Sequence, residues 1–230
     1  MPEVVVALDF TRAAEALHLV ERLPEARWVK IGSILMTREG PALVETLLAR
    51  GLQVFLDLKW HDIPNTVADA VAAARDLGVG MATVHTLGGA GMLGAAVASA
   101  GGQLALVGVT VLTSHDAGSY ARAVGRDQVN LECEVERLAA VGMRAGLAGV
   151  ACSPHEISCV RRILGPSARI VVPGIRRKSD RSEDQVRVAS AAEAASAGAT
   201  HLVVGRPILQ ASDPAAAFRS LVEEAQCVGS

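Results

Sequence analysis

The chain has 230 residues, half of them hydrophobic, and a formal net charge of −2 at pH 7. This length is sufficient for one domain with a well-buried core, and the balanced charge argues against a nucleic-acid-binding surface, which would be basic. No stretch approaches the roughly 20 uncharged apolar residues of a membrane helix, and no signal-peptide core precedes the first apolar run. We therefore expect a cytoplasmic protein with no nucleic-acid and no membrane partner.

Short apolar runs recur along the chain, with Ala- and Leu-rich helical patterns between them. The runs are residues 4–8, 28–31, 54–58, 81–84, 104–109, 149–151, 170–172 and 201–204. Continuous apolar strands that alternate with helices are typical of a parallel sheet buried on both faces. Eight such units in a chain of this length are typical of an α/β (β/α)8 TIM barrel, a fold that usually has about 250 residues. An open doubly wound sheet is the alternative. Because no linker divides the chain, we predict a single catalytic domain, residues 1–230.

The segment DLKWHDIPNT, residues 57–66, places two aspartates and a lysine within six positions of each other after the third run. Residues two apart on a strand share a face, so Asp57 and Lys59 are expected to point the same way. Asp62 is expected in the following loop, and Pro64 in a rigid turn that leads to a helix beginning near residues 66–68. A surface salt bridge is the alternative, although an exposed ion pair contributes only about 0 to 1 kcal/mol.

The active site of such a barrel lies at the C-terminal ends of its strands. Polar residues and turn formers stand at that position in every unit of this chain, and we expect them to converge on one pocket. They are Asp9, Lys30, Asp57, Lys59, His85, Thr113, Ser153, Pro173, Gly174, Gly205 and Arg206.

The loops after the seventh and eighth strands are where such barrels often bind phosphate. Here they read PGIR, residues 173–176, and GRPI, residues 205–208. Glycine allows the backbone to approach a ligand closely, and Arg176 and Arg206 can donate charge-assisted hydrogen bonds to phosphate oxygens. Residues 176–185, RRKSDRSEDQ, form either a lid that closes over the ligand or a solvated charged face. Gln185, at the end of this segment, could reach both a phosphate and a polar ring.

Two other patterns are weaker indications of function. The four cysteines form no CxxC pair and the six histidines show no metal-ligand spacing, so we expect neither a metal site nor disulfides. Gly89, Gly91 and Gly94 spell GxGxxG, but after the fourth run rather than the first. We interpret these glycines as sites of close packing rather than as a dinucleotide fingerprint.

Several motifs together resemble those of the orotidine 5′-monophosphate decarboxylase family, of the compact bacterial type, over essentially the whole chain. They are VALDF, WVKIG, FLDLKWHDIPNT, TVHTLGG, VTVLTS, CSPHE, VPGIR and VVGRPI. The DxKxxDIPNT signature is highly specific. The shorter DxKxxD is shared with magnesium-dependent sugar-phosphate barrels, such as the ketogulonate-phosphate decarboxylases and the hexulose-phosphate synthases.

The resemblance implies a TIM barrel that converts orotidine 5′-monophosphate to uridine 5′-monophosphate in de novo pyrimidine biosynthesis, with no cofactor. It implies that Lys59 is the proton donor, and that Lys30 and Asp57 bind ribose hydroxyls and order the charged array. Asp9 would contact the base and ribose region. The family's homodimer would supply Asp62, with Thr66 near it, to the neighbouring subunit's site.

The remaining implied contacts are with the ring and the phosphate of the substrate. Thr113 would hydrogen-bond the pyrimidine, and Gln185 would bridge ring and phosphate. The phosphate would be bound by the loops that contain Pro173, Arg176, Gly205 and Arg206. Relatives usually carry a proline and glycines where this chain has RRKSDRSED. Two alternatives stay open: a magnesium-dependent sugar-phosphate lyase or decarboxylase on the same barrel, and a non-catalytic nucleotide-phosphate-binding protein.

Overall fold

Eight parallel strands form a closed barrel in which every strand pairs with its neighbours along the chain, and β8 pairs with β1. The computed structural model describes residues 1–176 and 188–226. The strands are β1 (Glu3–Ala7), β2 (Trp28–Gly32), β3 (Gln53–Trp60), β4 (Met81–His85), β5 (Ala105–Val109), β6 (Gly149–Ala151), β7 (Arg169–Val172) and β8 (His201–Val204). The barrel prediction is confirmed, and the alternative of an open sheet is wrong.

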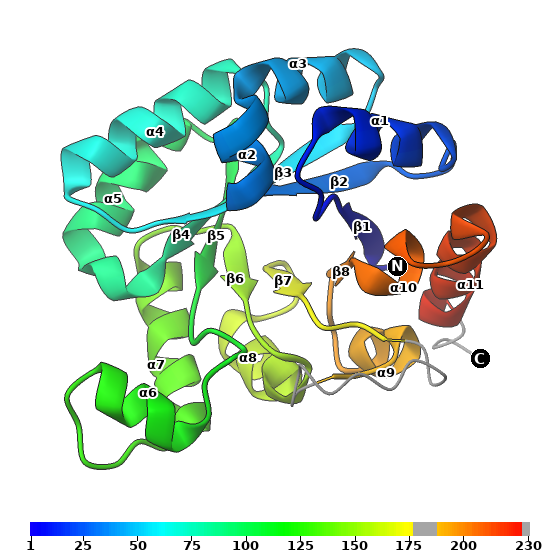
Figure 1. The fold of residues 1–230 in the computed structure, drawn as a ribbon. Coiled ribbons are helices and arrows are strands. Elements are labelled where there is room, and N and C mark those ends of the chain that lie inside the picture. Colours follow the sequence, from blue (N-terminus) through cyan, green and yellow to red (C-terminus); the bar gives the residue numbers. More distant parts are fainter. Residues whose placement is uncertain (177–187, 227–230) are drawn as a thin grey trace.

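Helices surround this barrel (Figure 1). They are α1 (Ala13–Glu21), α2 (Ser33–Glu39), α3 (Pro41–Ala49), α4 (Pro64–Asp76), α5 (Gly89–Ala100), α6 (Ala117–Ala123), α7 (Leu131–Arg144), α8 (Ile157–Leu164), α9 (Ala191–Ser196), α10 (Arg206–Leu209) and α11 (Pro214–Gln226). Two 3₁₀ turns, η1 (Thr86–Gly88) and η2 (Pro154–Glu156), follow β4 and β6. In the part of the chain that the structure describes, no helix is long and apolar enough to cross a membrane.

Alternation along the strands divides the core into two parts. Val4 and Val6 belong to the large cluster between sheet and helices, whereas Val5 and Ala7 belong to a small cluster inside the barrel. The inner cluster is built from Val5, Ala7, Phe55, Met81, Val107, Val171 and Val203. Phe55 is 2% exposed, and burying a side chain of this size contributes about 1.5 to 3 kcal/mol. The inner face is therefore apolar in its middle layer, and it forms a floor beneath whatever occupies the C-terminal end.

Local sequence sets several helix starts. Proline is favoured in the first helical turn, because its missing N–H would have no intrahelical partner there, and Pro64 begins α4 in this way. The predicted start near residues 66–68 is therefore too late by about half a turn to one turn. At α9, the Ser190 hydroxyl accepts from the Glu193 backbone N–H while the Glu193 carboxylate accepts from the Ser190 N–H, a capping box.

The close-packing interpretation of the GxGxxG glycines is wrong. A Cβ atom added at Gly89, Gly91 or Gly94 would meet nothing within 4 Å. Gly89 has a φ of +74°, a conformation that L side chains rarely adopt. The backbone conformation at position 89 therefore favours glycine, whereas no neighbour within the described chain requires glycine at positions 91 and 94.

Candidate active site

A cavity of about 360 Å³ lies at the C-terminal ends of the strands, above the inner apolar cluster. It has the volume typical of a small-ligand site. Most of the residues expected to converge on one pocket line it, namely Asp9, Lys30, Asp57, Lys59, Thr113, Pro173, Gly174, Gly205 and Arg206, together with Arg176 of the predicted phosphate loops. The expectation is wrong for His85 and Ser153, which do not line the cavity. The strand ends therefore bring together residues that are up to about 200 positions apart in the sequence.

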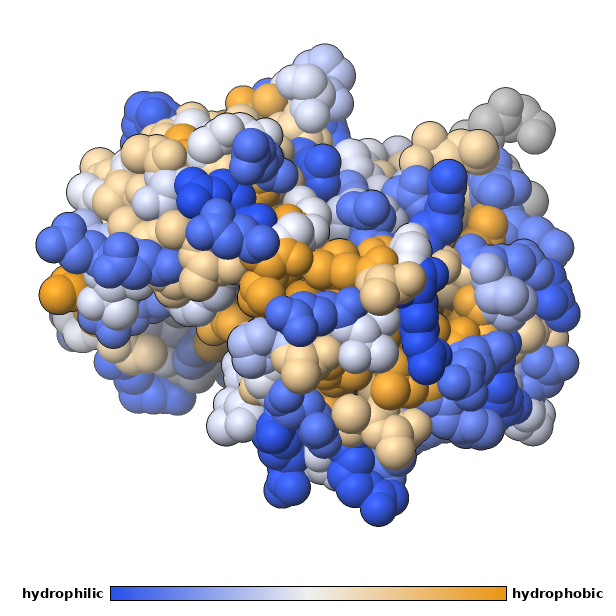
Figure 2. Space-filling view, turned by 90° about the horizontal axis from the view of Figure 1, so that it is seen from above, coloured by the Kyte–Doolittle hydropathy of each residue, from blue (hydrophilic) through white to orange (hydrophobic). Residues whose placement is uncertain are grey.

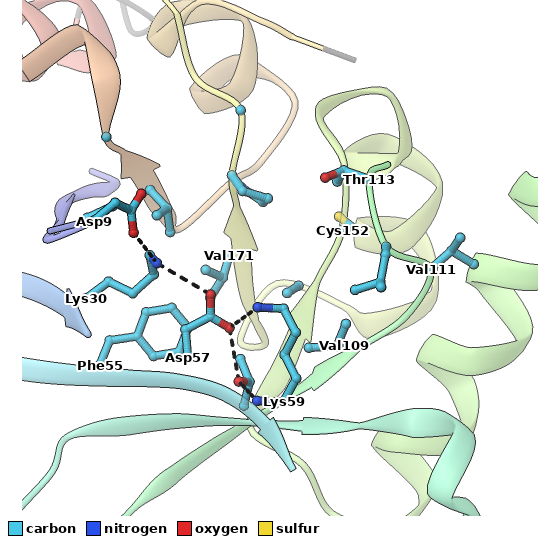
Figure 3. A pocket seen from close by; sticks show the side chains of 18 of the residues that line it. Asp9, Lys30, Phe55, Asp57, Lys59, Val109, Val111, Thr113, Cys152 and Val171 are labelled. Atoms are coloured by element: carbon cyan, nitrogen blue, oxygen red, sulfur yellow. Dashed lines mark hydrogen bonds and ion pairs between the residues drawn. The ribbon is translucent and has the colours of Figure 1, made fainter. Parts of the chain in front are cut away.

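Four charged side chains form a continuous array on one side of this cavity (Figure 3). Lys30 Nζ lies 3.1 Å from Asp9 Oδ1 and 3.6 Å from Asp57 Oδ2. Lys59 Nζ lies 2.8 Å from Asp57 Oδ1. Positive and negative groups therefore alternate along the array, and each lysine ammonium contacts a neighbouring carboxylate.

Asp57 is at the centre of the array and is mostly buried. Burial alone would raise the pKa of its carboxyl, but Lys30 and Lys59 outweigh that effect, and the pKa lies below its ordinary value. Asp57 is therefore ionised at neutral pH. The Lys59 side chain is 41% exposed, in contrast to 11% for Lys30, so Lys59 is the more accessible lysine of the cavity.

Lys59 reaches this position through an irregular backbone. The pairing of β3 with β4 shifts between Leu56 and Trp60, and Lys59 has a φ of +52°, the only positive φ of a non-glycine residue in the described ranges. Such a conformation costs about 1 to 3 kcal/mol and tends to occur at functional sites. The prediction that Asp57 and Lys59 point the same way is confirmed, since the two side chains are in contact, but the regular strand on which it was based is wrong at Lys59.

Asp62 and Thr66 do not line this cavity. Both lie in the exposed segment after β3, where the Asp62 carboxylate accepts from the Ile63 backbone N–H at 2.6 Å. Together with Lys59 and His61 they border a separate depression of about 320 Å³. The loop position predicted for Asp62 is confirmed, and within one chain its side chain belongs to a different surface from that of Asp9 and Lys30.

The opposite wall of the cavity is mainly apolar. Val109, Val111 and Cys152 face the charged array from β5 and β6 and the loops that follow them, and Thr113 lies above them (Figure 3). Burial raises the pKa of the Cys152 thiol well above its ordinary value, so this cysteine is a packed, protonated group. A ligand in the cavity would have charged groups on one face and aliphatic groups on the other.

Glycine and arginine form the third side of the cavity, at the ends of β7 and β8. Gly174 has a φ of +79°, and a Cβ at Gly205 would lie 3.2 Å from Asp9 Oδ2. Arg176 is 8% exposed, and its backbone N–H donates to Ala189 at 3.0 Å. Both arginines line the cavity as expected. Gln185 and most of the expected lid lie outside the described residues.

Two side chains that the sequence did not single out are important here. Thr83 and Phe55 both line the cavity. The signal that could have identified them is alternation along the strand: Phe55 is two residues before Asp57, and Thr83 is two residues before His85.

His85 is held near the array as a neutral group. Its ring stacks on that of His61 at a centroid distance of 5.3 Å. Burial lowers the pKa of His85 to about 4, and repulsion from His61 and Lys59 adds to this. The imidazole is therefore uncharged at neutral pH. Its Nδ1 lies 3.3 Å from the Leu87 backbone nitrogen, which donates to it, so His85 supports the turn after β4.

One group among the described side chains has the spacing of metal ligands. It consists of Glu132, Glu136 and Cys159, on α7 and α8, and none of the three lines the cavity. In the cavity itself the carboxylates of Asp9 and Asp57 both contact Lys30. A lysine ammonium thus lies between the two acidic side chains that could otherwise share a cation.

Comparisons with known proteins match this chain over nearly its whole length. Residues 2–221 match the family described as orotidine 5′-phosphate decarboxylase / HUMPS. The chain is 49% identical over 232 residues to an orotidine 5′-phosphate decarboxylase of Halorhodospira halophila, covering 99% of this chain and 98% of that protein. It is 45% identical over 225 residues to one of Chromohalobacter salexigens, covering 96% and 94%.

A solved structure shares the fold. The crystal structure of orotidine 5′-phosphate decarboxylase from Lactobacillus acidophilus superposes with a TM-score of 0.88 at 32% identity. The match covers 98% of this chain and 99% of that one.

Proposed function

Because the chain belongs to the orotidine 5′-phosphate decarboxylase / HUMPS family, we propose that it decarboxylates orotidine 5′-monophosphate to uridine 5′-monophosphate, a step of de novo pyrimidine biosynthesis. The observation that carries this proposal is the array of Lys30, Asp57 and Lys59 at the mouth of the barrel. The more exposed of its two lysine side chains, that of Lys59, lines a cavity of suitable size.

The chemistry explains why such an array is needed. When CO2 leaves C6 of the orotate ring, the electron pair of the broken bond stays in an orbital that the ring cannot delocalise. A positive group fixed beside C6 before the substrate arrives stabilises this charge with little reorganisation. Lys59 Nζ is such a group, since Asp57 holds it at 2.8 Å. Lys59 then donates a proton to C6, which yields uridine 5′-monophosphate.

The other cavity residues have distinct roles in this proposal. Asp9 and Lys30 bind the ribose, with Asp57, and Thr113 hydrogen-bonds the pyrimidine. Pro173, Arg176, Gly205 and Arg206 surround the phosphate, and Gln185 bridges phosphate and ring. Binding energy from the remote phosphate is then available at the transition state. The support for these roles is that all of them except Gln185 line the same cavity.

The second part of the proposal is a homodimer in which Asp62 and Thr66 complete the neighbouring site. Both residues border a depression outside their own chain's cavity. Large apolar side chains are exposed after four successive strands: Ile34 and Ile63 are 64% and 66% exposed, Leu87 and Leu112 40% and 37%. Figure 2 shows an exposed strip of hydrophobic residues among hydrophilic ones on one face of the molecule. Exposed apolar groups of this kind favour association.

The proposal also covers cofactor and compartment. The reaction as described uses no metal or organic cofactor, because the charge on C6 is stabilised by Lys59 directly. We propose a cytoplasmic location, since Cys152 and Cys159 are buried, unpaired thiols, which are typical of a reducing compartment.

The proposed activity is tested by following the loss of orotidine 5′-monophosphate absorbance, with and without a chelator. We expect full turnover in both conditions, and in Lys59→Ala a fall in kcat of at least about a thousandfold with binding of uridine 5′-monophosphate retained. Activity that disappears with the chelator would favour the magnesium-dependent alternative. A protein that binds the nucleotide but never turns it over would favour the non-catalytic one.

A further inference from the structure

Thr83 connects the two partners of the Lys59–Asp57 pair. It lies on β4, beside the strand that carries both residues, and it is 1% exposed. Its hydroxyl accepts from the Lys59 backbone N–H at 2.8 Å and donates to Asp57 Oδ1 at 3.1 Å. That same carboxylate oxygen accepts from Lys59 Nζ at 2.8 Å. The three groups thus form a closed ring of hydrogen bonds.

The hydroxyl has a fixed direction in this ring. A threonine hydroxyl has one proton to donate and two lone pairs. An N–H can only donate and an ionised carboxylate can only accept, so the single hydroxyl proton must point to Asp57 while a lone pair receives the Lys59 N–H. Neither valine nor alanine can make either contact, whereas serine can make both.

The Lys59 backbone needs such a contact. Between Leu56 and Trp60 the register of β3 against β4 is interrupted, and there the Lys59 N–H is bonded to a side chain rather than to a strand carbonyl. Lys59 also has the unfavourable φ of +52°. A conformation of this kind persists only where surrounding contacts hold it. The hydrogen bond from the Lys59 N–H to the Thr83 hydroxyl is such a contact, and it acts directly on the Lys59 backbone.

We propose that Thr83 is a positioning residue for the decarboxylation, which holds both the backbone of Lys59 and the carboxylate of Asp57 so that the Lys59 ammonium is aimed at the reacting carbon. This inference rests on the proposed function of Lys59 as the proton donor. Thr83 acts through Lys59 and Asp57 and need not touch the reacting atoms itself.

The role predicts a specific kinetic pattern. Loss of the hydroxyl should reduce transition-state stabilisation more than substrate binding, because Asp57 keeps its contacts with Lys30 and Lys59 and the phosphate-binding residues that the structure describes do not contact Thr83. In Thr83→Val, an isosteric change, kcat should fall about ten- to hundredfold while KM changes less than about threefold. Thr83→Ser keeps the hydroxyl, and its kcat should stay within about threefold of wild type.

The pH profile provides a second readout. Burial raises the pKa of Asp57, and the lysines and the Thr83 hydrogen bond lower it to below its ordinary value. Removing the hydroxyl takes away one of the lowering contributions. The acid limb of kcat/KM should therefore move to higher pH in Thr83→Val and not in Thr83→Ser.

The matched control is Thr200→Val. The Thr200 hydroxyl also accepts a backbone N–H, that of Ile170 at 2.9 Å, but just before β8, at the opposite end of the barrel. This variant should keep the wild-type kcat and acid limb. If Thr83→Val does not fold, the same comparison can be made between Thr83→Ala and Thr83→Ser. The kcat of the alanine variant should then be at least about tenfold lower than that of the serine variant.

Equal kcat in the hydroxyl-free and wild-type proteins would overturn the positioning role, as would a serine variant as slow as the valine variant. Crystal structures of wild type and Thr83→Val distinguish failure of the positioning role from failure of the proposed function. If wild type does not turn over orotidine 5′-monophosphate, the proposed function fails. The positioning role is then decided by whether Lys59 leaves its φ of +52° and its 2.8 Å contact, and an unchanged Lys59 overturns it.

Discussion

At Lys59, backbone conformation and side-chain charge depend on each other. The left-handed φ places the side chain next to Asp57, and the ion pair and the Thr83 hydrogen bond hold that φ in return. A residue in an unfavourable conformation is thus surrounded by contacts that fix it before any ligand binds. This arrangement matches what electrostatic catalysis requires, since charges that are already oriented need little reorganisation in the transition state.

His201, at the other end of the barrel, makes stability depend on pH. His201 is 7% exposed, and its ring packs edge-on against that of Trp28. Burial lowers the pKa of His201 to about 4, and Arg169 adds to this. Between pH 6.5 and about 4 the unfolded chain therefore binds a proton at this residue that the folded chain does not. The free energy of unfolding should fall as the pH falls through this range.

The variant His201→Gln isolates this contribution. Urea unfolding at pH 7 and pH 4.5 should show that wild type loses about 2 to 3 kcal/mol more than the variant does over this interval. His18→Gln, on the exposed side of α1, should follow wild type. Parallel losses in wild type and His201→Gln would show that His201 does not cause the pH dependence.

At the scale of elements, a buried carboxylate joins α6 to α7. Glu134 on α7 is 5% exposed and accepts from the Tyr120 hydroxyl on α6 at 3.1 Å and from Arg137 Nη2 at 2.6 Å. The Arg137 hydrogen bond lowers the pKa of Glu134 to about 2 against the opposing effect of burial, and Tyr120 adds to the lowering. The network holds the α6 segment, which follows Thr113 in the chain, against the barrel.

Glu134→Gln should therefore destabilise the protein by about 1.5 to 3 kcal/mol, the range for hydrogen bonds to a charged group, as measured by urea unfolding. Amide hydrogens of α6 should exchange faster than in wild type, because their helix loses its anchor. The control is Glu132→Gln, exposed on the same helix, which should change stability by less than about 0.5 kcal/mol. Similar effects of the two substitutions would contradict the anchoring role.

Individual strands and helices show how much of the fold could be predicted from the sequence. Strand bounds were predictable to within two residues, because apolar runs between helical patterns have few other interpretations in a parallel sheet. The interruption in β3 could not be predicted, because the left-handed conformation of Lys59 depends on a contact with a residue of β4 that is 24 positions away in the chain. The early start of α4 could have been predicted from Pro64, since proline favours the first helical turn.

At the scale of the molecule, one chain has a cavity with charged, apolar and basic sides but lacks Asp62 and Thr66 among its lining residues. The sequence placed Asp62 in the loop after β3 and Thr66 near the start of the helix that follows, and it could not show by alternation or spacing which chain's cavity they serve. In the proposed homodimer, that depends on how two barrels meet. A twofold interface would bury the apolar side chains exposed after β2 to β5 and deliver each Asp62 to the partner.

The most direct test of this account mixes two inactive variants. Lys59→Ala and Asp62→Ala are purified separately, unfolded, combined in equal amounts and refolded. If Asp62 serves the partner's site, each mixed dimer has one site with both residues intact and one with neither.

Half of the dimers are mixed, so decarboxylation of orotidine 5′-monophosphate should recover to about a quarter of the specific activity of refolded wild type. Each variant refolded alone controls for residual activity. No recovery in the mixture, with dimers confirmed by light scattering, would contradict the shared site.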